Sequence, residues 1–155
     1  MLVIDVDGTL TDGKIYMGQD GEIFKVFNIK DGYAIHELLP KYNIIPVVIT
    51  GRISRIVENR ARELGIKHIY QGVEDKIEQL RKLVSEINIS LANVAYIGDD
   101  INDLDCMKNC GFKGCPADAE PKIKKIANFI SKKKGGEGAV REFIETIIRK
   151  YRKNK

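Results

Sequence analysis

Leu2-Val-Ile-Asp5-Val-Asp7-Gly-Thr9-Leu-Thr11 is the stretch that decides the fold, because an apolar run passes directly into two acids, a glycine and a threonine. Apolar residues without polar alternation are typical of a strand that is covered on both faces, as in a parallel sheet. Asp and Gly favour turns, so the chain is expected to leave the sheet here. We therefore predict a buried strand near the N-terminus, with polar side chains gathered at its carboxyl end.

Working outward, apolar runs alternate with segments of helical periodicity. The further predicted strands are Ile45–Ile49, His68–Tyr70, Val94–Ile97 and Phe129–Ile130. The predicted helices cover 33–42, where the helix opens after Asp31, 53–64, 75 to about 87, about 100–111 and 137–151. Alternation of strands and helices predicts an α/β fold with a doubly wound, mostly parallel, Rossmann-like sheet.

One segment departs from this alternation. Residues 14–27 form two short β-like runs around Gln19-Asp20-Gly21, which predicts a projecting β-hairpin. Its apolar residues, among them Ile15, Met17 and Ile23, would be exposed in a monomer, so we expect the hairpin to serve in oligomerisation. Residues 135–155 are expected to form a C-terminal tail and helix, and residues 1–155 a single domain.

The composition excludes several classes of protein. The chain has 155 residues, of which 43% are hydrophobic and 31% charged, which is ordinary for a globular domain and excludes intrinsic disorder. No apolar run reaches the roughly 18 residues of a membrane span, and no leader pattern is seen, so a cytoplasmic location without membrane partners is expected. The net charge of +4 comes largely from late basic runs, which we interpret as solvated surface without nucleic-acid binding. Cys106, Cys110 and Cys115 are expected to pack as reduced, small apolar residues.

Three polar clusters follow the predicted strands, at Asp5–Thr9, at Thr50–Arg52 and at Gly98–Asp103. Ligands of open α/β sheets bind at the carboxyl ends of the strands, so these clusters are expected to meet. Acids from two strands would repel one another there, and a divalent cation would relieve that repulsion. Because all the ligands are oxygens, the expected cofactor is Mg²⁺.

The same residue types suit phosphoryl transfer. A carboxylate held against Mg²⁺ can form an aspartyl-phosphate intermediate, and a second carboxyl two residues later can protonate the leaving alcohol. The Thr50 hydroxyl, the Gly51 N–H and the Lys76 ammonium can bind phosphate oxygens.

Asp5-Val-Asp-Gly-Thr-Leu-Thr, Thr50-Gly-Arg, Lys76 and Gly98-Asp-Asp-Ile-Asn-Asp, in this order, resemble the four motifs of the haloacid dehalogenase-like hydrolases over almost the whole chain. The resemblance implies that Asp5 is the nucleophile and a metal ligand, and that Asp7 is the acid/base and binds the metal through its carbonyl. It makes Asp99 the third metal ligand and Thr50 and Lys76 the phosphate binders. Asp100 and Asp103 match acids that lie behind these ligands or reach the metal through water.

No cap domain fits between the motifs, because the first interval has room only for the hairpin and one helix, and the second only for one helix and one short strand. Asp12-Gly13, Asn28-Ile-Lys-Asp-Gly32, Tyr70-Gln-Gly72 and Gly135-Gly-Glu-Gly-Ala-Val-Arg-Glu142 resemble the capless family of 3-deoxy-D-manno-octulosonate 8-phosphate phosphatases, which serve lipopolysaccharide synthesis. That resemblance implies a Mg²⁺-dependent homotetramer, with hairpins forming a central barrel and pockets for a small anionic sugar phosphate at the subunit interfaces. The implied substrate-binding residues are Asn28, Ile29, Lys30, Asp31, Gly32, His36, Arg52 and Arg60.

Arg52 and Arg60 lie two turns apart on one predicted helix and can face the same side, where arginines bind a sugar carboxylate. Two positions depart from the pattern, since His36 and Glu137 stand where basic residues are expected. Within the enzyme class the alternatives are an N-acylneuraminate 9-phosphate phosphatase and a broader sugar phosphatase. Outside it they are a phospho-acceptor switch and a non-catalytic oligomerisation module.

Overall fold

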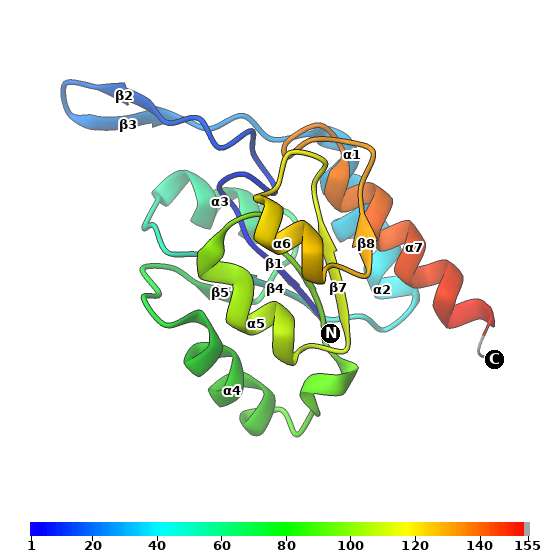
Figure 1. The fold of residues 1–155 in the computed structure, drawn as a ribbon. Helices are drawn as coiled ribbons and strands as arrows, with labels where there is room; N and C mark the ends of the chain where they lie inside the picture. Colours follow the sequence, from blue (N-terminus) through cyan, green and yellow to red (C-terminus); the bar gives the residue numbers. More distant parts are fainter. Residues whose placement is uncertain (154–155) are drawn as a thin grey trace.

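The computed structural model describes residues 1–153, and a parallel sheet of six strands runs through its centre (Figure 1). The strands are β1 (Leu2–Ile4), β4 (Pro46–Ile49), β5 (His68–Tyr70), β6 (Ala95–Ile97), β7 (Phe112–Cys115) and β8 (Phe129–Ile130). Their order across the sheet is β5-β4-β1-β6-β7-β8, and each neighbouring pair is parallel. This confirms the predicted doubly wound α/β fold and places β1 between β4 and β6.

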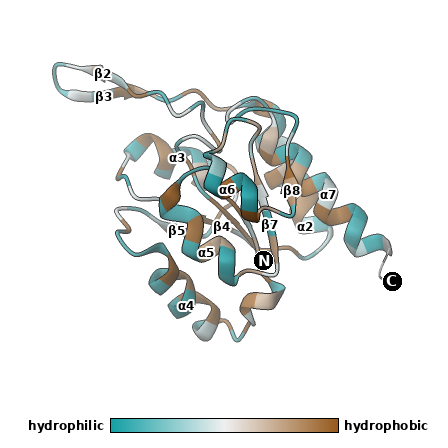
Figure 2. Ribbon diagram, viewed as in Figure 1, coloured by the Kyte–Doolittle hydropathy of each residue, from teal (hydrophilic) through white to brown (hydrophobic). Residues whose placement is uncertain are grey.

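Helices cover both faces of the sheet. One face carries α1 (Ile29–Tyr33), η1 (Ala34–Leu38), α2 (Leu39–Lys41), α3 (Arg55–Glu63) and α7 (Ala139–Lys153). The other carries α4 (Lys76–Glu86), η2 (Leu91–Asn93), α5 (Leu104–Asn109) and α6 (Pro121–Ile126), while η3 (Ile101–Asp103) leads into α5. Side chains of β1 alternate between the two cores, Leu2 and Ile4 on the first face and Val3 on the second, and the central strands are accordingly apolar (Figure 2). None of the helices within residues 1–153 is long and apolar enough to span a membrane.

Three local predictions were wrong. The first helix begins at Ile29 rather than after Asp31, because the Asn28 side chain accepts the Lys30 N–H at 2.8 Å and caps it. It continues to Lys41 through the π-helical turn η1. Strand β7 and helix α6 were not predicted, since the first contains a lysine and a glycine and the second is a short, lysine-rich turn. Both belong to the part of the sheet on the β8 side, and β7 pairs with β6.

The predicted hairpin is confirmed and projects from the body of the molecule (Figure 1). It consists of β2 (Tyr16–Gly18) and β3 (Gly21–Phe24), and the rings of Tyr16 and Phe24 stack at 4.4 Å. Its apolar side chains remain exposed, to 60% for both Met17 and Ile23. A sheet of two strands has no core of its own, so this surface is left without cover in the single chain.

The three cysteines are free and buried, as predicted. Burial raises the pKa of Cys106 and Cys110 to about 12 and that of Cys115 to about 11. These thiols therefore stay protonated and pack as apolar groups. The expected C-terminal helix is present as α7, and residues 154–155 of the expected tail lie outside the described residues.

Candidate active site

The carboxyl ends of three adjacent strands bring the predicted motifs together. Asp5 follows β1, Thr50 follows β4, and Asp99 follows β6 after Gly98. Because β1 pairs with both other strands, these residues share one edge of the sheet. This is the place where parallel α/β sheets bind their ligands.

Lys76 joins two of the acids at the centre of this edge. Its Nζ donates to Asp5 Oδ1 at 2.7 Å and to Asp103 Oδ1 at 2.8 Å. The exposed fractions of the three side chains are only 1%, 6% and 0% for Lys76, Asp5 and Asp103. Lys76 is the first residue of α4, whose N-terminus is capped by the Asp75 side chain. A buried ammonium is stable only when it is paired, so Lys76 and the two carboxylates depend on each other.

Asp103 has a full set of hydrogen bonds. Its Oδ1 accepts from Lys76 and from the Tyr96 hydroxyl at 2.7 Å, and its Oδ2 accepts the N–H groups of Asp99 and Asp100 at 3.0 and 3.3 Å. All the lone pairs of the carboxylate are thereby used. Asp103 therefore holds the loop that presents Asp99, whereas Asp100 is exposed and caps η3.

Asp99 lies beside the first motif. Its Oδ1 accepts from the Thr9 hydroxyl at 2.8 Å. A Cβ on Gly8, whose φ is +91°, would lie 2.0 Å from Asp99 Oδ2, so glycine suits this position both for its backbone and for the close approach of the carboxylate. Carboxylate oxygens of Asp5, Asp99 and Asp103 lie within 4.8 Å of one another. Lys76 pairs with Asp5 and Asp103, and Asp99 adds a third carboxylate to the group, so the cluster carries an excess of negative charge that suits a divalent cation.

The electrostatics of the cluster point the same way. Burial, and then the charge of Asp103, raise the pKa of Asp5 well above its ordinary value, despite Lys76. Burial also raises the pKa of Asp99 to about 6, although the Thr9 hydrogen bond opposes the shift. Burial alone would lower the pKa of Lys76, but the two carboxylates raise it overall, so the ammonium stays charged. Ionisation of Asp5 in this buried place is therefore favoured by further positive charge at this edge.

Asp7 belongs to a different set of contacts. Its Oδ1 accepts a hydrogen bond from Lys25, and its Oδ2 lies 3.9 Å from Arg52 Nε. Lys25 follows β3 of the hairpin, is buried, and also pairs with Glu22 Oε1 at 2.9 Å. Burial alone would lower the pKa of Lys25, but Asp7 and Glu22 raise it overall. Sequence reasoning missed Lys25 and Glu22, because both lie in a stretch that only indicates a hairpin.

Thr50 and Gly51 line the neighbouring part of the edge. Thr50 is buried, and its backbone bonds to Tyr70 O at 2.9 Å and Val73 N at 3.1 Å. A Cβ on Gly51 would lie 3.9 Å from Asn102 Nδ2, so the amide of Asn102 lies close to Gly51. Asn102 also lines a cavity of about 260 Å³ together with Lys76. Asn102 and Tyr96 are further residues that the sequence analysis gave no role.

The residues expected to bind the sugar do not form one group. Arg52 is exposed and lies near Asp7, and it precedes α3, which begins at Arg55. The prediction that Arg52 and Arg60 share a face of one helix was therefore wrong. Lys30 is exposed, and Asn28 donates its amide to Gly136 O at 3.3 Å. Asp31 is buried and accepts the Arg141 N–H at 2.7 Å, at the start of α7. Burial raises the pKa of Asp31 to about 6.

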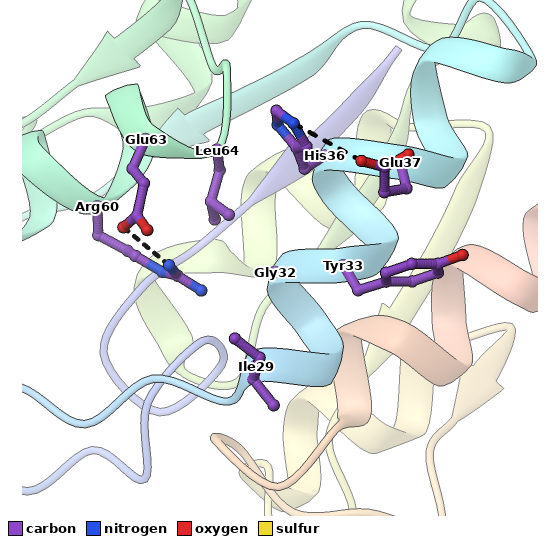
Figure 3. A pocket seen from close by; sticks show the side chains of 8 residues that line it. All are labelled: Ile29, Gly32, Tyr33, His36, Glu37, Arg60, Glu63 and Leu64. Carbon is purple, nitrogen blue, oxygen red and sulfur yellow. Dashed lines mark hydrogen bonds and ion pairs between the residues drawn. The ribbon is translucent and has the colours of Figure 1, made fainter.

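The others line a separate pocket of about 330 Å³ between α1, η1 and α3 (Figure 3). The lining residues are Ile29, Gly32, Tyr33, His36, Glu37, Arg60, Glu63 and Leu64. Arg60 Nη1 lies 2.9 Å from Glu63 Oε2, and its Nε is buried without a hydrogen-bond partner among the described residues. The four acids of the sheet edge, Asp5, Asp7, Asp99 and Asp103, do not line this pocket.

The glycine-rich segment before α7 packs onto the first motif. The Gly136 N–H donates to Thr9 O at 3.1 Å, and a Cβ on Gly135 would lie 1.9 Å from Gly8 O. Gly136 also has a φ of +70°. Glycines are therefore required here by close approach of the two backbones. Glu137, which departs from the pattern, is exposed on this segment.

Comparison with known proteins agrees with this geometry. A family described as haloacid dehalogenase-like hydrolase matches residues 68–144. The 3-deoxy-D-manno-octulosonate 8-phosphate phosphatase of Yersinia pestis is 43% identical over 148 residues, which cover 96% of this chain and 79% of that protein. The corresponding phosphatase of Escherichia coli strain K12 is 42% identical over 96% of this chain and 78% of its own length.

Solved structures give the same result. The Moraxella catarrhalis phosphatase, crystallised with a magnesium ion, a phosphate ion and a KDO molecule, has a TM-score of 0.91 and 40% identity, covering 96% of this chain and 84% of that one. The cobalt-bound enzyme of Haemophilus influenzae has a TM-score of 0.91 and 34% identity, with coverage of 96% and 86%. The chain therefore belongs to the haloacid dehalogenase-like hydrolases, within the family of 3-deoxy-D-manno-octulosonate 8-phosphate phosphatases.

Proposed function

We propose that this chain is a Mg²⁺-dependent phosphatase that hydrolyses 3-deoxy-D-manno-octulosonate 8-phosphate through an aspartyl-phosphate intermediate. The observation that carries the proposal is the cluster of Asp5, Asp99 and Asp103 at the carboxyl edge of the sheet, in which the buried Lys76 ammonium pairs with Asp5 and Asp103. Relatives more than 40% identical over nearly the whole chain bear the name of this phosphatase. Independent helix caps would not bring these acids together around one lysine.

Asp5 and Asp99 would hold the metal ion through their carboxylates, and Asp7 through its main-chain carbonyl. Asp103 is left as a support, because its oxygens already accept four hydrogen bonds. The donor set consists of oxygens alone, which fits Mg²⁺. When bound, the ion supplies positive charge that screens the phosphoryl oxygens from the attacking carboxylate.

In the first half of the reaction, a carboxylate oxygen of Asp5 attacks phosphorus, and the bond from phosphorus to the sugar oxygen breaks. Asp7 donates its proton to that oxygen, so the sugar leaves as an alcohol. In the second half, Asp7 takes a proton from water as the water oxygen attacks phosphorus. The bond to Asp5 then breaks, phosphate leaves, and both carboxyl groups return to their starting state. Thr50, Gly51 and Lys76 bind the phosphoryl oxygens.

The acidic sugar would be held by arginines. Arg52, beside Asp7, can bind its carboxylate within the same subunit. Arg60 lines the separate pocket of Figure 3. It would contact a sugar phosphate only if that pocket lies next to the sheet-edge acids of a neighbouring subunit. The exposed apolar face of the hairpin supports such an assembly, a homotetramer with a central barrel of hairpins.

The experiment is Mg²⁺-dependent phosphate release from a panel of sugar phosphates. The panel contains 3-deoxy-D-manno-octulosonate 8-phosphate, N-acetylneuraminate 9-phosphate and simple hexose phosphates, with Asp5→Asn as the inactive control. Preference for the eight-carbon acid is expected. Preference for the nine-carbon acid would mean that the departures at His36 and Glu137 have changed the sugar specificity of the pocket. No phosphate release from any compound would overturn the proposal.

A further inference from the structure

The carboxylate of Asp7 is held by the hairpin rather than by the sheet. Its Oδ1 accepts from Lys25, which lies 18 residues further along, directly after the second hairpin strand. The Lys25 side chain is only 1% exposed, whereas that of Asp7 is 21% exposed. A partly exposed aspartate without such a partner would move among several rotamers.

Lys25 is itself fixed in position. Glu22, three residues earlier, pairs with its ammonium at 2.9 Å, and Glu22 also accepts a hydrogen bond from the Ser54 hydroxyl. Ser54 is the N-cap of α3. The ammonium is therefore anchored on the hairpin and at α3, and it presents a donor to Asp7 from a fixed place.

We propose that Lys25, anchored by Glu22, is a positioning residue that holds the Asp7 carboxyl where it transfers protons to and from the reacting oxygens. The inference rests on the proposed function, in which Asp7 is the acid/base. A direct role in binding substrate does not fit, because an ammonium that is 99% covered by the protein and paired with two carboxylates is not open to a ligand.

Loss of a residue that positions Asp7 should slow the reaction more when the leaving group needs a proton, whereas loss of a residue that binds phosphate should slow it equally for all leaving groups. Departure of a sugar alcohol needs protonation, so it depends on a well-placed Asp7, and general acid catalysis contributes about 10²- to 10⁴-fold. Departure of 4-nitrophenolate needs little protonation, because its conjugate acid is a much stronger acid than an alcohol. The value of kcat/KM for each substrate is informative, because it includes only the steps up to and including departure of the leaving group.

The experiment measures kcat/KM of Lys25→Met for 3-deoxy-D-manno-octulosonate 8-phosphate and for 4-nitrophenyl phosphate, both with Mg²⁺. We expect a loss of about 10- to 100-fold for the sugar phosphate and of less than about threefold for 4-nitrophenyl phosphate. Lys14→Met is the matched control on the same hairpin, since the Lys14 side chain is 72% exposed and pairs with Asp12, away from Asp7 and Glu22. It should leave both values unchanged.

Equal losses for both substrates would show that Lys25 acts through stability or phosphate binding, and would overturn the proposal, as would no loss for either. If Lys25→Met does not fold, Glu22→Gln tests the same anchor, because it removes the carboxylate that fixes Lys25 but keeps an oxygen for the Ser54 hydroxyl. The same larger loss for the sugar phosphate is then expected. Failure of the proposed function is seen separately, as absence of sugar-phosphate hydrolysis by the unmodified chain.

Discussion

Asp5 and Asp7 are two residues apart in the sequence, yet different parts of the molecule hold them. Asp5 is buried at the end of β1 and bonds to Lys76 of α4. Asp7 is partly exposed and bonds to Lys25, which follows the hairpin strand β3. The site thus has a sheet-held half, around Asp5, and a hairpin-held half, around Asp7. In the proposed mechanism, attack on phosphorus belongs to the first half and proton transfer to the second, which connects proton transfer to a hairpin whose apolar face is exposed.

The largest effect should come from the sheet-held half. Asp5→Asn removes the proposed nucleophile and is expected to lower kcat by at least about a thousandfold, because no covalent intermediate can form. The free energy of unfolding should stay the same or rise, since the change relieves repulsion from the buried Asp103. Phosphate release and urea denaturation measure both. Full activity in this variant would remove Asp5 from the mechanism.

Lys76→Met tests how far the sheet-held half depends on one cation. It leaves the carboxylates of Asp5 and Asp103 buried without their ammonium, which should cost about 3–5 kcal/mol of unfolding free energy. Added Mg²⁺ should restore part of this loss if the cluster binds the ion. Urea denaturation with and without Mg²⁺ is the measurement. A loss under about 1 kcal/mol would show that the pairing contributes little.

Asp31 lies outside both halves and tests whether burial of an acid alone affects stability. Because burial raises its pKa from 3.8 to about 6, the folded state binds the proton more tightly than the unfolded state. This stabilisation is present below pH 4 and is lost as the pH rises to about 6, by at most about 3 kcal/mol. Asp31→Asn keeps an acceptor for the Arg141 N–H and does not titrate.

The measurement is the unfolding free energy of the unmodified chain minus that of Asp31→Asn, between pH 4 and 7. Titration of Asp5 and Asp99 affects both proteins and cancels. We expect the difference to fall as the pH rises to about 6 and to level off above it. A difference that does not change with pH would contradict the raised pKa.

The smallest effect is expected in the hairpin-held half. Ile23→Lys places a charge on the exposed apolar face of the hairpin, and Gln19→Lys at the turn is the control. The first should reduce the mass measured by sedimentation and lower kcat/KM for the sugar phosphate by about tenfold, since burial of an isoleucine contributes about 1.5–3 kcal/mol. An unchanged mass for Ile23→Lys would mean that another surface joins the subunits.

Much of this arrangement could be predicted because its signals are local. Each motif acid directly follows an apolar run, and the carboxyl ends of adjacent parallel strands meet. Asp5, Thr50 and Asp99 were found in this way, whereas Lys76 was found from its place at the start of a predicted helix and from the order of the motifs. The helix beginning at Ile29 was misplaced, because Asp31 looked like a cap while its partner, the Arg141 N–H, lies 110 residues away.

The sequence by itself determined the alternation of strands and helices up to β6, the hairpin and the acids at the sheet edge, because periodicity and turn chemistry depend on near neighbours along the chain. Only the tertiary structure decided which charges pair. Lys76 meets Asp5 across 71 residues, and Tyr96 donates to Asp103 from a strand that reads as plain core. The pairing of Lys25 with Asp7 needs the hairpin to fold back on the first motif. Such pairs follow from burial, which makes an unpaired charge costly and leaves the folded chain only a few ways to satisfy it.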